Sequence, residues 1–474
     1  MRNKAIYRYL GKVLISFSGV MLIPLIVALI FRESIVPFLV SGSISLVLGL
    51  IFFIIFNKNE NLYAKEGFMI VSLSWIMISI ISAIPFVLGA GVPFSSAFFE
   101  SCSGLSTTGA TIFADVEHLA KSILFWRSFT HFLGGMGVLT FVMAIVPLSK
   151  KDKSMHVLKA EMPGPEVAKL VPSIKKTLFY LYAIYVGLTF LEFILLLIFK
   201  MPVFDSMLIS FGTAGTGGFA LYNSSLASYT VGAKIVVTLF MLLFGVNFNI
   251  YFLIIMKDIK SALKSEELRT YLLIYVASVL LIVFSTYKYF ANFGEALLSG
   301  AFHISSFMTS TGYAIGDVNI YPTNCRVVVL LLMLISACAG STCGGFKMSR
   351  LIICVKKIKR DITRLIHPNM VKDIKFEGKR LDDSVIDSTT SFLLLYVVLI
   401  IIIMFIISFD PLKLTFSETI NATFTTFANV GLAFDVSNFA LFSPISKIVL
   451  SIGMLLGRLE IFPVIVLFTN INKS

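Results

Sequence analysis

Apolar blocks about 20 residues long follow one another along most of this 474-residue chain. A helix needs about 20 apolar residues to cross roughly 30 Å of hydrocarbon. The pattern therefore predicts ten membrane-spanning helices, at residues 11–31, 35–56, 66–90, 122–148, 177–199, 232–256, 271–290, 326–355, 391–409 and 444–469. Four further segments, at 93–105, 203–213, 295–308 and 416–427, are too short to span and are expected to be re-entrant or buried. The expected fold class is an all-α polytopic membrane protein.

Lysine and arginine are divided unequally between the two sides of these spans. Segments 1–12, 57–66, 150–176, 257–269, 347–380 and the C-terminal tail contain 29 of the 39 basic residues, and the opposite side contains nine. Loops rich in Lys and Arg stay in the cytoplasm, so both termini are expected to be cytoplasmic. The net charge of +13 then reflects topology, and no nucleic-acid partner is expected.

With this orientation, each short segment lies on the outer side between an outward-going and an inward-going span. The chain is then a leading helix pair followed by four pseudo-symmetric units of span, pore helix, polar turn and span, arranged around one central pore. The expected boundaries are 1–62 for the leading pair and 63–160, 161–265, 266–380 and 381–474 for the four repeats.

A polar turn follows each short segment. The turns read STTGAT, AGTGGF, TSTGYA and ANVGLA, and their alignment places Gly109, Gly217, Gly312 and Gly431 at one common position. Gly218 lies beside Gly217, which leaves the register of the second turn open. Four glycines at the same point of four units are a much stronger signal than any one Thr-Gly pair.

Such turns suit cation coordination. Non-helical backbone at membrane depth is tolerated only where it packs in protein or lines a water-filled cavity. Carbonyl oxygens pointing into a pore can replace the hydration shell of a cation. The candidate filter residues are Thr107, Thr108, Gly109, Thr216, Gly217, Gly218, Ser310, Thr311, Gly312, Asn429, Val430 and Gly431. Three acids that follow the turns, Asp115, Asp317 and Asp435, are either an outer mouth that concentrates cations or ordinary loop residues.

Together these features resemble the Trk/Ktr/HKT superfamily of cation transporters. Three stretches resemble its bacterial TrkH branch: AEMPGPEVAKL (160–170), GSTCGGFKMSR (340–350) and GRLEIFPVIVLF (457–468). The resemblance implies potassium as the transported ion, bound at the filter residues, and a location in the cytoplasmic membrane of a bacterium. It also implies a homodimer and a TrkA-type cytosolic nucleotide-binding regulatory subunit. The chain itself has no GxGxxG and no Walker motif, and no organic cofactor is expected.

A gate is predicted where span 326–355 is interrupted by small residues. Each glycine in a helix costs about 1 kcal/mol relative to alanine, so the segment should break there. The alternative is that the small residues serve close helix packing. Arg458 lies deep in the last span, where a charge indicates function, and the resemblance places this arginine beside the loop. The candidate gate residues are Gly340, Ser341, Thr342, Cys343, Gly344, Gly345, Lys347 and Arg458.

Two other functions are compatible with parts of the sequence. Glu192 is the main acidic residue within the spans, and it would suit a symporter that couples K⁺ to Na⁺ or H⁺. An intramembrane enzyme could be imagined around His131, or around His303 with Ser305 and Ser306, but neither set has a metal-ligand pattern or a triad. The basic inner segments are also expected to contact anionic lipid.

Overall fold

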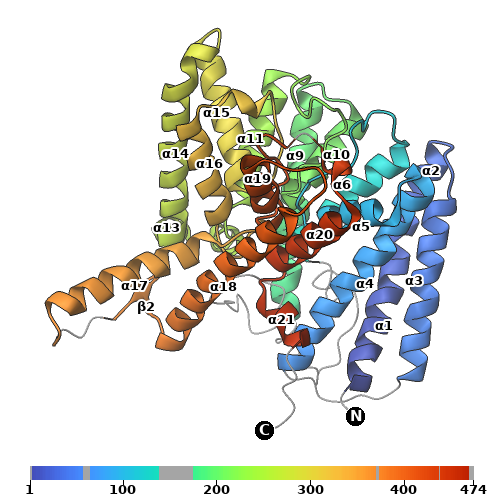
Figure 1. Ribbon diagram of the computed structural model, residues 1–474, viewed down its shortest axis with the longest axis horizontal. Coiled ribbons are helices and arrows are strands. Elements are labelled where there is room, and N and C mark those ends of the chain that lie inside the picture. The colour runs from blue at the N-terminus through green and yellow to red at the C-terminus, as the bar shows by residue number, and fades with distance from the viewer. Residues whose placement is uncertain (1–2, 57–63, 138–173, 370–372, 437, 469–474) are drawn as a thin grey trace.

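The computed structural model describes residues 3–56, 64–137, 174–369, 373–436 and 438–468, and these residues are mostly helical (Figure 1). The only strands in these ranges are β1 (Lys375–Phe376) and β2 (Lys379–Arg380), which pair as an antiparallel hairpin. The motif at 160–170 and the inner half of the predicted span 122–148 lie outside the described residues.

The leading helices are α1 (Asn3–Val20), α2 (Leu22–Ile30) and α3 (Val36–Ile55). Helices α1 and α3 lie against α4 (Ala64–Ala90), whereas α2 lies against α6 (Lys121–Gly135). Helices α1 and α3 approach closely at two glycines. A Cβ atom added at Gly11 would lie 2.8 Å from the carbonyl oxygen of Gly49. Small residues allow such close packing between membrane helices, where no hydrophobic force draws them together.

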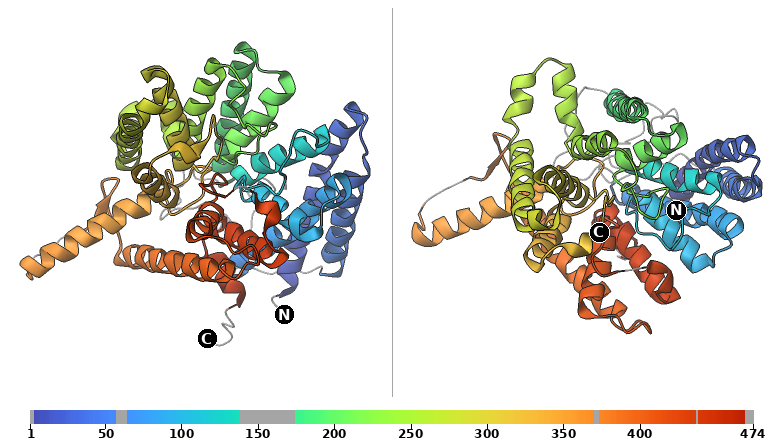
Figure 2. Two further views of the ribbon diagram at one scale, coloured as in Figure 1. Left: turned by 45° about the horizontal axis from the view of Figure 1, so that its top comes forward. Right: turned by 90° about the horizontal axis from the view of Figure 1, so that it is seen from above.

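Four sets of helices follow, and from above their colours run in order around a common middle (Figure 2). The first set is α4, α5 (Phe94–Leu105) and α6 (Lys121–Gly135). The second is α9 (Ile174–Ile198), α10 (Val203–Gly215), α11 (Val231–Phe244) and α12 (Phe248–Ile255). After the short α13 (Ile259–Lys264), the third is α14 (Glu266–Thr286), α15 (Phe293–Met308), α16 (Thr323–Ile335) and α17 (Met348–Ile366). The fourth is α18 (Asp383–Ile407), α19 (Phe416–Phe427), α20 (Pro444–Arg458) and α21 (Phe462–Phe468). Single 3₁₀ turns occur at Tyr287–Tyr289, Val318–Ile320 and Phe439–Leu441.

Six stretches are long and apolar enough to cross a membrane, namely 4–30, 36–55, 65–90, 177–198, 266–289 and 383–407. A seventh results if α11 and α12, which meet at 92°, count as one span. The prediction of continuous helices over 232–256 and 444–469 was therefore wrong, because both break, as 326–355 was expected to do. Span 122–148 was predicted as the second span of the first repeat, and there α6 ends at Gly135.

Two of these endings lie next to crowded glycines. A Cβ atom at Gly134 would overlap the carbonyl oxygen of Leu105, the last residue of α5. A Cβ atom at Gly457 would overlap the carbonyl oxygen of Phe427, the last residue of α19. The second helix of each of these two sets thus touches the end of the short helix, and only glycine fits there.

Candidate functional site

The four short helices α5, α10, α15 and α19 all end in the same backbone motif. In each, one residue adopts the left-handed conformation, and the amide of the next residue donates to the carbonyl five positions earlier. The left-handed residues are Thr107, Thr216, Ser310 and Asn429, with φ of 58°, 53°, 54° and 57°. The donating amides are those of Thr108, Gly217, Thr311 and Val430, each 2.8 Å from its acceptor. This is the Schellman ending, which satisfies helix carbonyls while turning the chain sharply.

In every turn, the residue after the donating amide is a glycine with positive φ. The φ angles are 81° at Gly109, 77° at Gly218, 82° at Gly312 and 82° at Gly431. A Cβ atom on any of them would overlap a carbonyl oxygen of the neighbouring turn. The overlapping pairs are Gly109 with Gly217, Gly218 with Thr311, Gly312 with Val430, and Gly431 with Thr108. The four contacts close on themselves, so the turns form one ring.

The second turn differs by one residue from the sequence alignment. Gly218, and not Gly217, has the backbone conformation and the ring contact of the other three glycines. Gly217 instead lies against His131, whose ring a Cβ atom would overlap. Both glycines of this turn are therefore required, for different reasons.

The ring contains oxygen atoms that have no hydrogen-bond partner in the part of the chain that the structure describes. Within the described chain, no carbonyl oxygen of the twelve candidate filter residues accepts a hydrogen bond. The buried Oγ1 of Thr107 and Oδ1 of Asn429 also have no partner among the described residues. An unsatisfied buried acceptor costs about 1–3 kcal/mol. Neutral oxygens grouped in this way are the ligands that a dehydrated cation needs.

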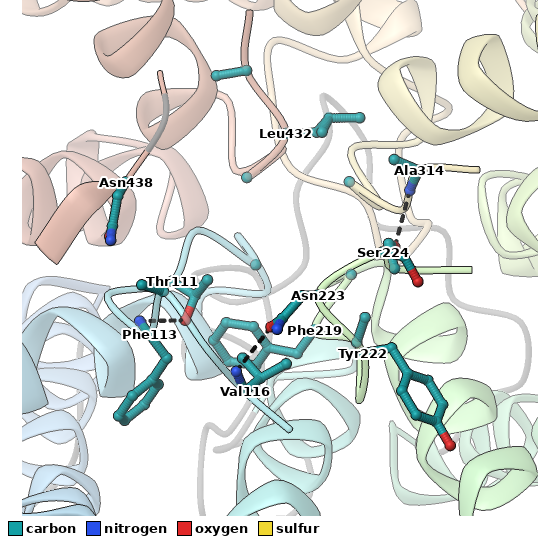
Figure 3. A pocket seen from close by; sticks show the side chains of 18 of the residues that line it. Thr111, Phe113, Val116, Phe219, Tyr222, Asn223, Ser224, Ala314, Leu432 and Asn438 are labelled. Atoms are coloured by element: carbon teal, nitrogen blue, oxygen red, sulfur yellow. Dashed lines mark hydrogen bonds between the residues drawn. The ribbon is translucent and has the colours of Figure 1, made fainter. Parts of the chain in front are cut away.

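A cavity of about 580 Å³ opens above the ring and has the glycines Gly109, Gly218, Gly312 and Gly431 in its lining (Figure 3). Loops from all four sets line it. Asn223 links two of these loops, because its Oδ1 accepts a hydrogen bond from the Val116 amide at 3.0 Å.

Sequence reasoning missed a buried ion pair beside this cavity. Arg127 lines the cavity, and its Nε donates to Oε1 of Glu100 at 2.8 Å. The two side chains are 2% and 0% exposed. The same arginine donates to Thr111 Oγ1 at 3.1 Å and to the Ala220 carbonyl at 3.2 Å, and Glu100 Oε2 accepts from the Ile112 amide at 2.9 Å. The pair therefore braces the first two turns. Glu100 and Arg127 are 27 positions apart in the sequence, so no local sequence pattern predicts that they pair.

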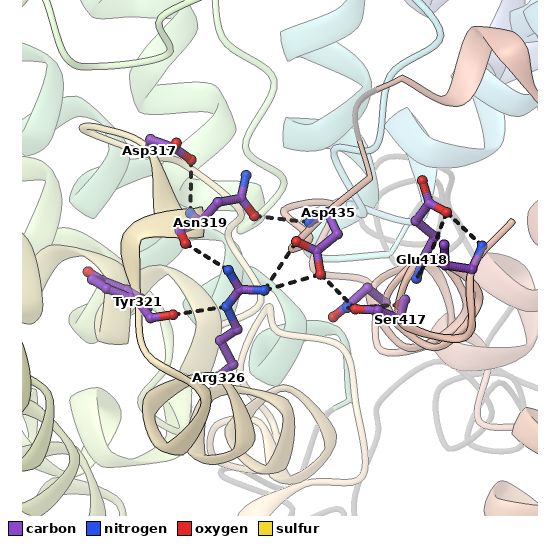
Figure 4. Close-up of polar contacts among 9 residues, drawn as sticks. Asp317, Asn319, Tyr321, Arg326, Ser417, Glu418 and Asp435 are labelled. Carbon is purple, nitrogen blue, oxygen red and sulfur yellow. Dashed lines mark hydrogen bonds and ion pairs between the residues drawn. The ribbon is translucent and has the colours of Figure 1, made fainter.

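The three candidate mouth acids differ in their surroundings. Asp317 lines the cavity. Asp435 binds Arg326 at 3.1 Å, so its charge is compensated (Figure 4). Asp115 accepts from Asn223 at 3.0 Å, and this bond together with that from the Glu117 amide holds the pKa of Asp115 below its usual range.

The candidate gate loop, residues 336–347, lies against the turns. Thr216 Oγ1 donates to the Thr342 carbonyl at 3.1 Å, and the Gly344 amide donates to Ser310 Oγ at 2.9 Å. A Cβ atom on Gly344 would lie 2.7 Å from Cβ of Asn429. The loop therefore touches three of the four left-handed residues.

Arg458, the last residue of α20, reaches the same loop. It donates to the Thr342 carbonyl at 2.6 Å and to the Gly134 and Gly135 carbonyls at 2.5 and 2.6 Å. Arg458 thus joins the loop to the end of α6. Glu460, two residues after Arg458, pairs with Arg350 at 2.5 Å.

The remaining loop residues hold its shape. Gly340 and Gly345 have φ of 65° and 77°, and Lys347 has φ of 80°. The buried Lys347 Nζ donates to the Cys343 carbonyl. Ser341 Oγ donates to the Cys338 carbonyl at 2.6 Å. The loop is therefore folded rather than extended.

The histidines considered for an enzyme brace the backbone. His131 Nε2 accepts from the Phe219 amide at 3.2 Å, so the proton is on Nδ1, which donates to the Gly104 carbonyl at 2.8 Å. His303 Nε2 accepts from the Ile315 amide at 3.3 Å, and its Nδ1 lies 2.7 Å from the Tyr321 hydroxyl. Among the described residues no group of three His, Cys, Asp or Glu side chains could hold a metal.

The helices and the oxygen-lined ring define an integral membrane protein for cation transport. Residues 42–474 match the family model described as "TrkH: Cation transport protein". The chain belongs to the TrkH family, which consists of transporters and not of enzymes.

The chain is similar to several named proteins over nearly its whole length. It is 32% identical to the Trk system potassium uptake protein TrkH of Salmonella typhimurium, over 99% of both chains. It is also 32% identical to the Trk system potassium uptake protein TrkG of Escherichia coli, over 96% of this chain and 95% of that one. The crystal structure of the potassium transporter TrkH from Vibrio parahaemolyticus matches with a TM-score of 0.89 at 29% identity, covering 99% of each chain.

Proposed function

We propose that this protein takes up potassium through one channel-like pore formed by four pseudo-symmetric repeats. The observation that carries the proposal is the closed ring of contacts from each glycine to a carbonyl of the next turn. A ring of neutral oxygens can replace the hydration shell of K⁺. The relatives named as potassium uptake proteins supply the identity of the ion.

The ion would pass from the outer cavity through the ring toward the cytoplasm. Helices α5, α10, α15 and α19 end at the ring. Their C-terminal dipole ends are negative and favour a cation there. Asp317 adds a negative charge at the cavity, while the paired Asp435 contributes less.

The loop 336–347 is the proposed gate, and Arg458 holds it closed. In this position the loop lies against Thr216, Ser310 and Asn429. The positive charge of Arg458 on the inner side of the ring would also repel a cation that reaches the loop. Opening requires the Thr342 carbonyl to leave the guanidinium.

The cellular setting is proposed from the charge pattern and the relatives. We place the protein in the cytoplasmic membrane of a bacterium with both termini inside, since most basic residues lie in loops of one side. The relatives' names refer to a Trk system, which supports a TrkA-type nucleotide-binding regulatory subunit and a homodimer. The basic helix α17 projects from the body, where it can reach anionic lipid (Figure 1).

The test is rubidium uptake into liposomes that contain the purified protein, with K⁺ or Na⁺ as competitor. We expect uptake that K⁺ competes for more strongly than Na⁺. Gly109→Ser should lower both flux and selectivity, because the added Cβ would overlap the Gly217 carbonyl. Unchanged flux and selectivity in this variant would refute the position of the first turn.

One observation favours a symporter as the second candidate. Glu192 is fully buried on α9, and neither of its carboxyl oxygens has a hydrogen-bond partner among the described residues. A buried carboxyl group without a partner is a plausible proton carrier. Uptake driven by a proton or sodium gradient at zero membrane potential, and lost in Glu192→Gln, would establish coupling. Uptake that follows the membrane potential alone would exclude it.

A further inference from the structure

One buried side chain outside the candidate gate loop bonds both the loop and the helix α17 that follows it. Glu267 lies in the first turn of α14 and is 3% exposed. Its Oε1 accepts from the Ala339 amide at 2.7 Å and from the Ser349 amide at 3.1 Å. Ala339 is within the gate loop and Ser349 is in the first turn of α17, so a single oxygen atom joins the loop to the helix that follows it.

The second oxygen of this carboxylate faces the break between α11 and α12. Asn247 Nδ2 lies 3.5 Å from Oε2 of Glu267, and the Phe248 amide donates to the Gly340 carbonyl at 3.1 Å. The Cys338 amide donates to the Gly245 carbonyl at 3.1 Å. Glu267 therefore lies where the gate loop meets the bend of the second set.

The backbone of the same residue is connected to the hairpin β1–β2. The amide of Glu267 donates to Oε1 of Glu377 at 3.0 Å, and Ser265 Oγ donates to the same oxygen at 2.8 Å. Glu377 is in the turn of the hairpin, with φ of 48°. Lys356 adds a second connection, because its Nζ donates to Glu266 at 2.6 Å and to the Lys375 carbonyl at 2.7 Å.

The hairpin is itself fixed to the helices beneath it. Ile374 and Leu381, which flank the two strands, form a small buried cluster with Ile353 of α17 and Ile386 of α18. We therefore expect a displacement of the hairpin to move the start of α14, through the contacts of Glu377 and Lys356. The chain of contacts runs from the hairpin through Glu377 to Glu267 and on to the gate loop.

We propose that Glu267 positions the gate loop in its closed state, and that Glu377 links this anchor to the hairpin so that a force on the hairpin reaches the gate. The inference rests on the proposed function, because it assumes that loop 336–347 closes the pore. Glu267 acts through the loop and does not touch the transported ion. Opening then requires the amides of Ala339 and Ser349 to leave the carboxylate.

The experiment measures rubidium flux through the full-length protein in liposomes without any cytosolic subunit. Glu267→Ala removes the acceptor of both amides and should raise basal flux by about tenfold, since two buried amides lose their hydrogen-bond partner in the closed position. Glu267→Gln keeps an oxygen in place and should restore most of the closure. Glu377→Ala should raise flux less, and the double variant should not exceed Glu267→Ala alone. Glu295→Gln, an exposed position on α15, is the matched control and should equal the wild type.

A second measurement separates positioning from mere stability. In a background without the other four cysteines, the rate at which a small thiol reagent modifies the buried Cys343 reports release of the loop. This rate should rise in Glu267→Ala and return toward the wild-type rate in Glu267→Gln, with both variants retaining a cooperative unfolding transition. If Glu267→Ala unfolds, Glu377→Ala alone carries the test, and wild-type flux and modification rate in it would overturn the proposal.

Arg458→Ala is measured in parallel to separate this inference from the gate itself. Raised flux in Arg458→Ala with unchanged flux in Glu267→Ala would overturn the role of Glu267 and leave the gate intact. Unchanged flux in both variants would overturn the gate. Raised flux in Glu267→Ala that Glu267→Gln reverses supports the inference.

Discussion

Replacing Arg458 with alanine is the sharpest perturbation of the proposed gate. The guanidinium donates hydrogen bonds of 2.5–2.6 Å to the carbonyl oxygens of Thr342, Gly134 and Gly135, and the bond to Thr342 joins it to the gate loop. A hydrogen bond to a charged group contributes about 1.5–3 kcal/mol. The weaker bond from the Thr216 hydroxyl to the same carbonyl remains in the variant. The loop should therefore lose about 1.5–3 kcal/mol of its preference for the closed position.

That free energy corresponds to an increase in the open fraction of about tenfold to about a hundredfold, at 1.4 kcal/mol per factor of ten. The assay is rubidium efflux from proteoliposomes without a regulatory subunit. Arg458→Lys should fall between wild type and alanine, because an ammonium group cannot reproduce the planar fork of the guanidinium. Arg269→Ala is the control, since the side chain of this exposed arginine donates to the Leu263 carbonyl of α13. Wild-type efflux from a folded Arg458→Ala protein would refute the reasoning.

Three further predictions concern the ring and the cavity. Gly218→Ser should abolish most rubidium flux, because a left-handed backbone costs a residue with a side chain about 1–2 kcal/mol and the added Cβ would overlap the Thr311 carbonyl. Gly316→Ser is the control, because Gly316 lies in open space at the cavity, and this variant should retain rubidium flux. Equal flux in the two variants would contradict the ring. Asp317→Asn should slow uptake at low salt and little at high salt, with a smaller effect for Asp435→Asn; the same loss at both salt concentrations would argue against an electrostatic role. Glu100→Ala should lower the thermal unfolding temperature, since a buried arginine without its partner costs about 3–5 kcal/mol; an unchanged unfolding temperature in a detergent-solubilised sample would exclude the brace.

The helical elements could be predicted from the sequence with good accuracy. The short segments predicted at 93–105, 203–213, 295–308 and 416–427 are helices at 94–105, 203–215, 293–308 and 416–427. Hydrophobic block length and the polar turns were sufficient, because both are local patterns.

The break in 326–355 was predicted from its small residues, whereas the helix endings inside 122–148, 232–256 and 444–469 could not be predicted from hydrophobic block length. In 122–148 and 444–469 the helix ends beside Gly134 and Gly457, which touch the ends of α5 and α19, and those contacts join residues 29 and 30 positions apart (105 to 134, and 427 to 457). The register of the second turn depends on which of two adjacent glycines, Gly217 or Gly218, has a positive φ, and the amino-acid sequence alone does not specify this.

The polar network of the site was the least predictable part. Glu100 with Arg127, and Glu267 with the amides of Ala339 and Ser349, are pairs of groups from different elements of the fold. Asp435 looked equivalent to Asp317 in spacing, and only the folded chain brings Arg326 to it. The identity of each polar residue was visible in the sequence, whereas its partner depended on tertiary packing.

The central claim is that the four turns form one cation site. Its most direct measurement is the position of Rb⁺, by anomalous diffraction from crystals grown in rubidium. The account predicts a peak on the axis among the carbonyl oxygens of Thr108, Gly217, Thr311 and Val430, displaced by K⁺ and reduced in Gly218→Ser. A rubidium peak elsewhere in the protein, with none inside the ring, would contradict it.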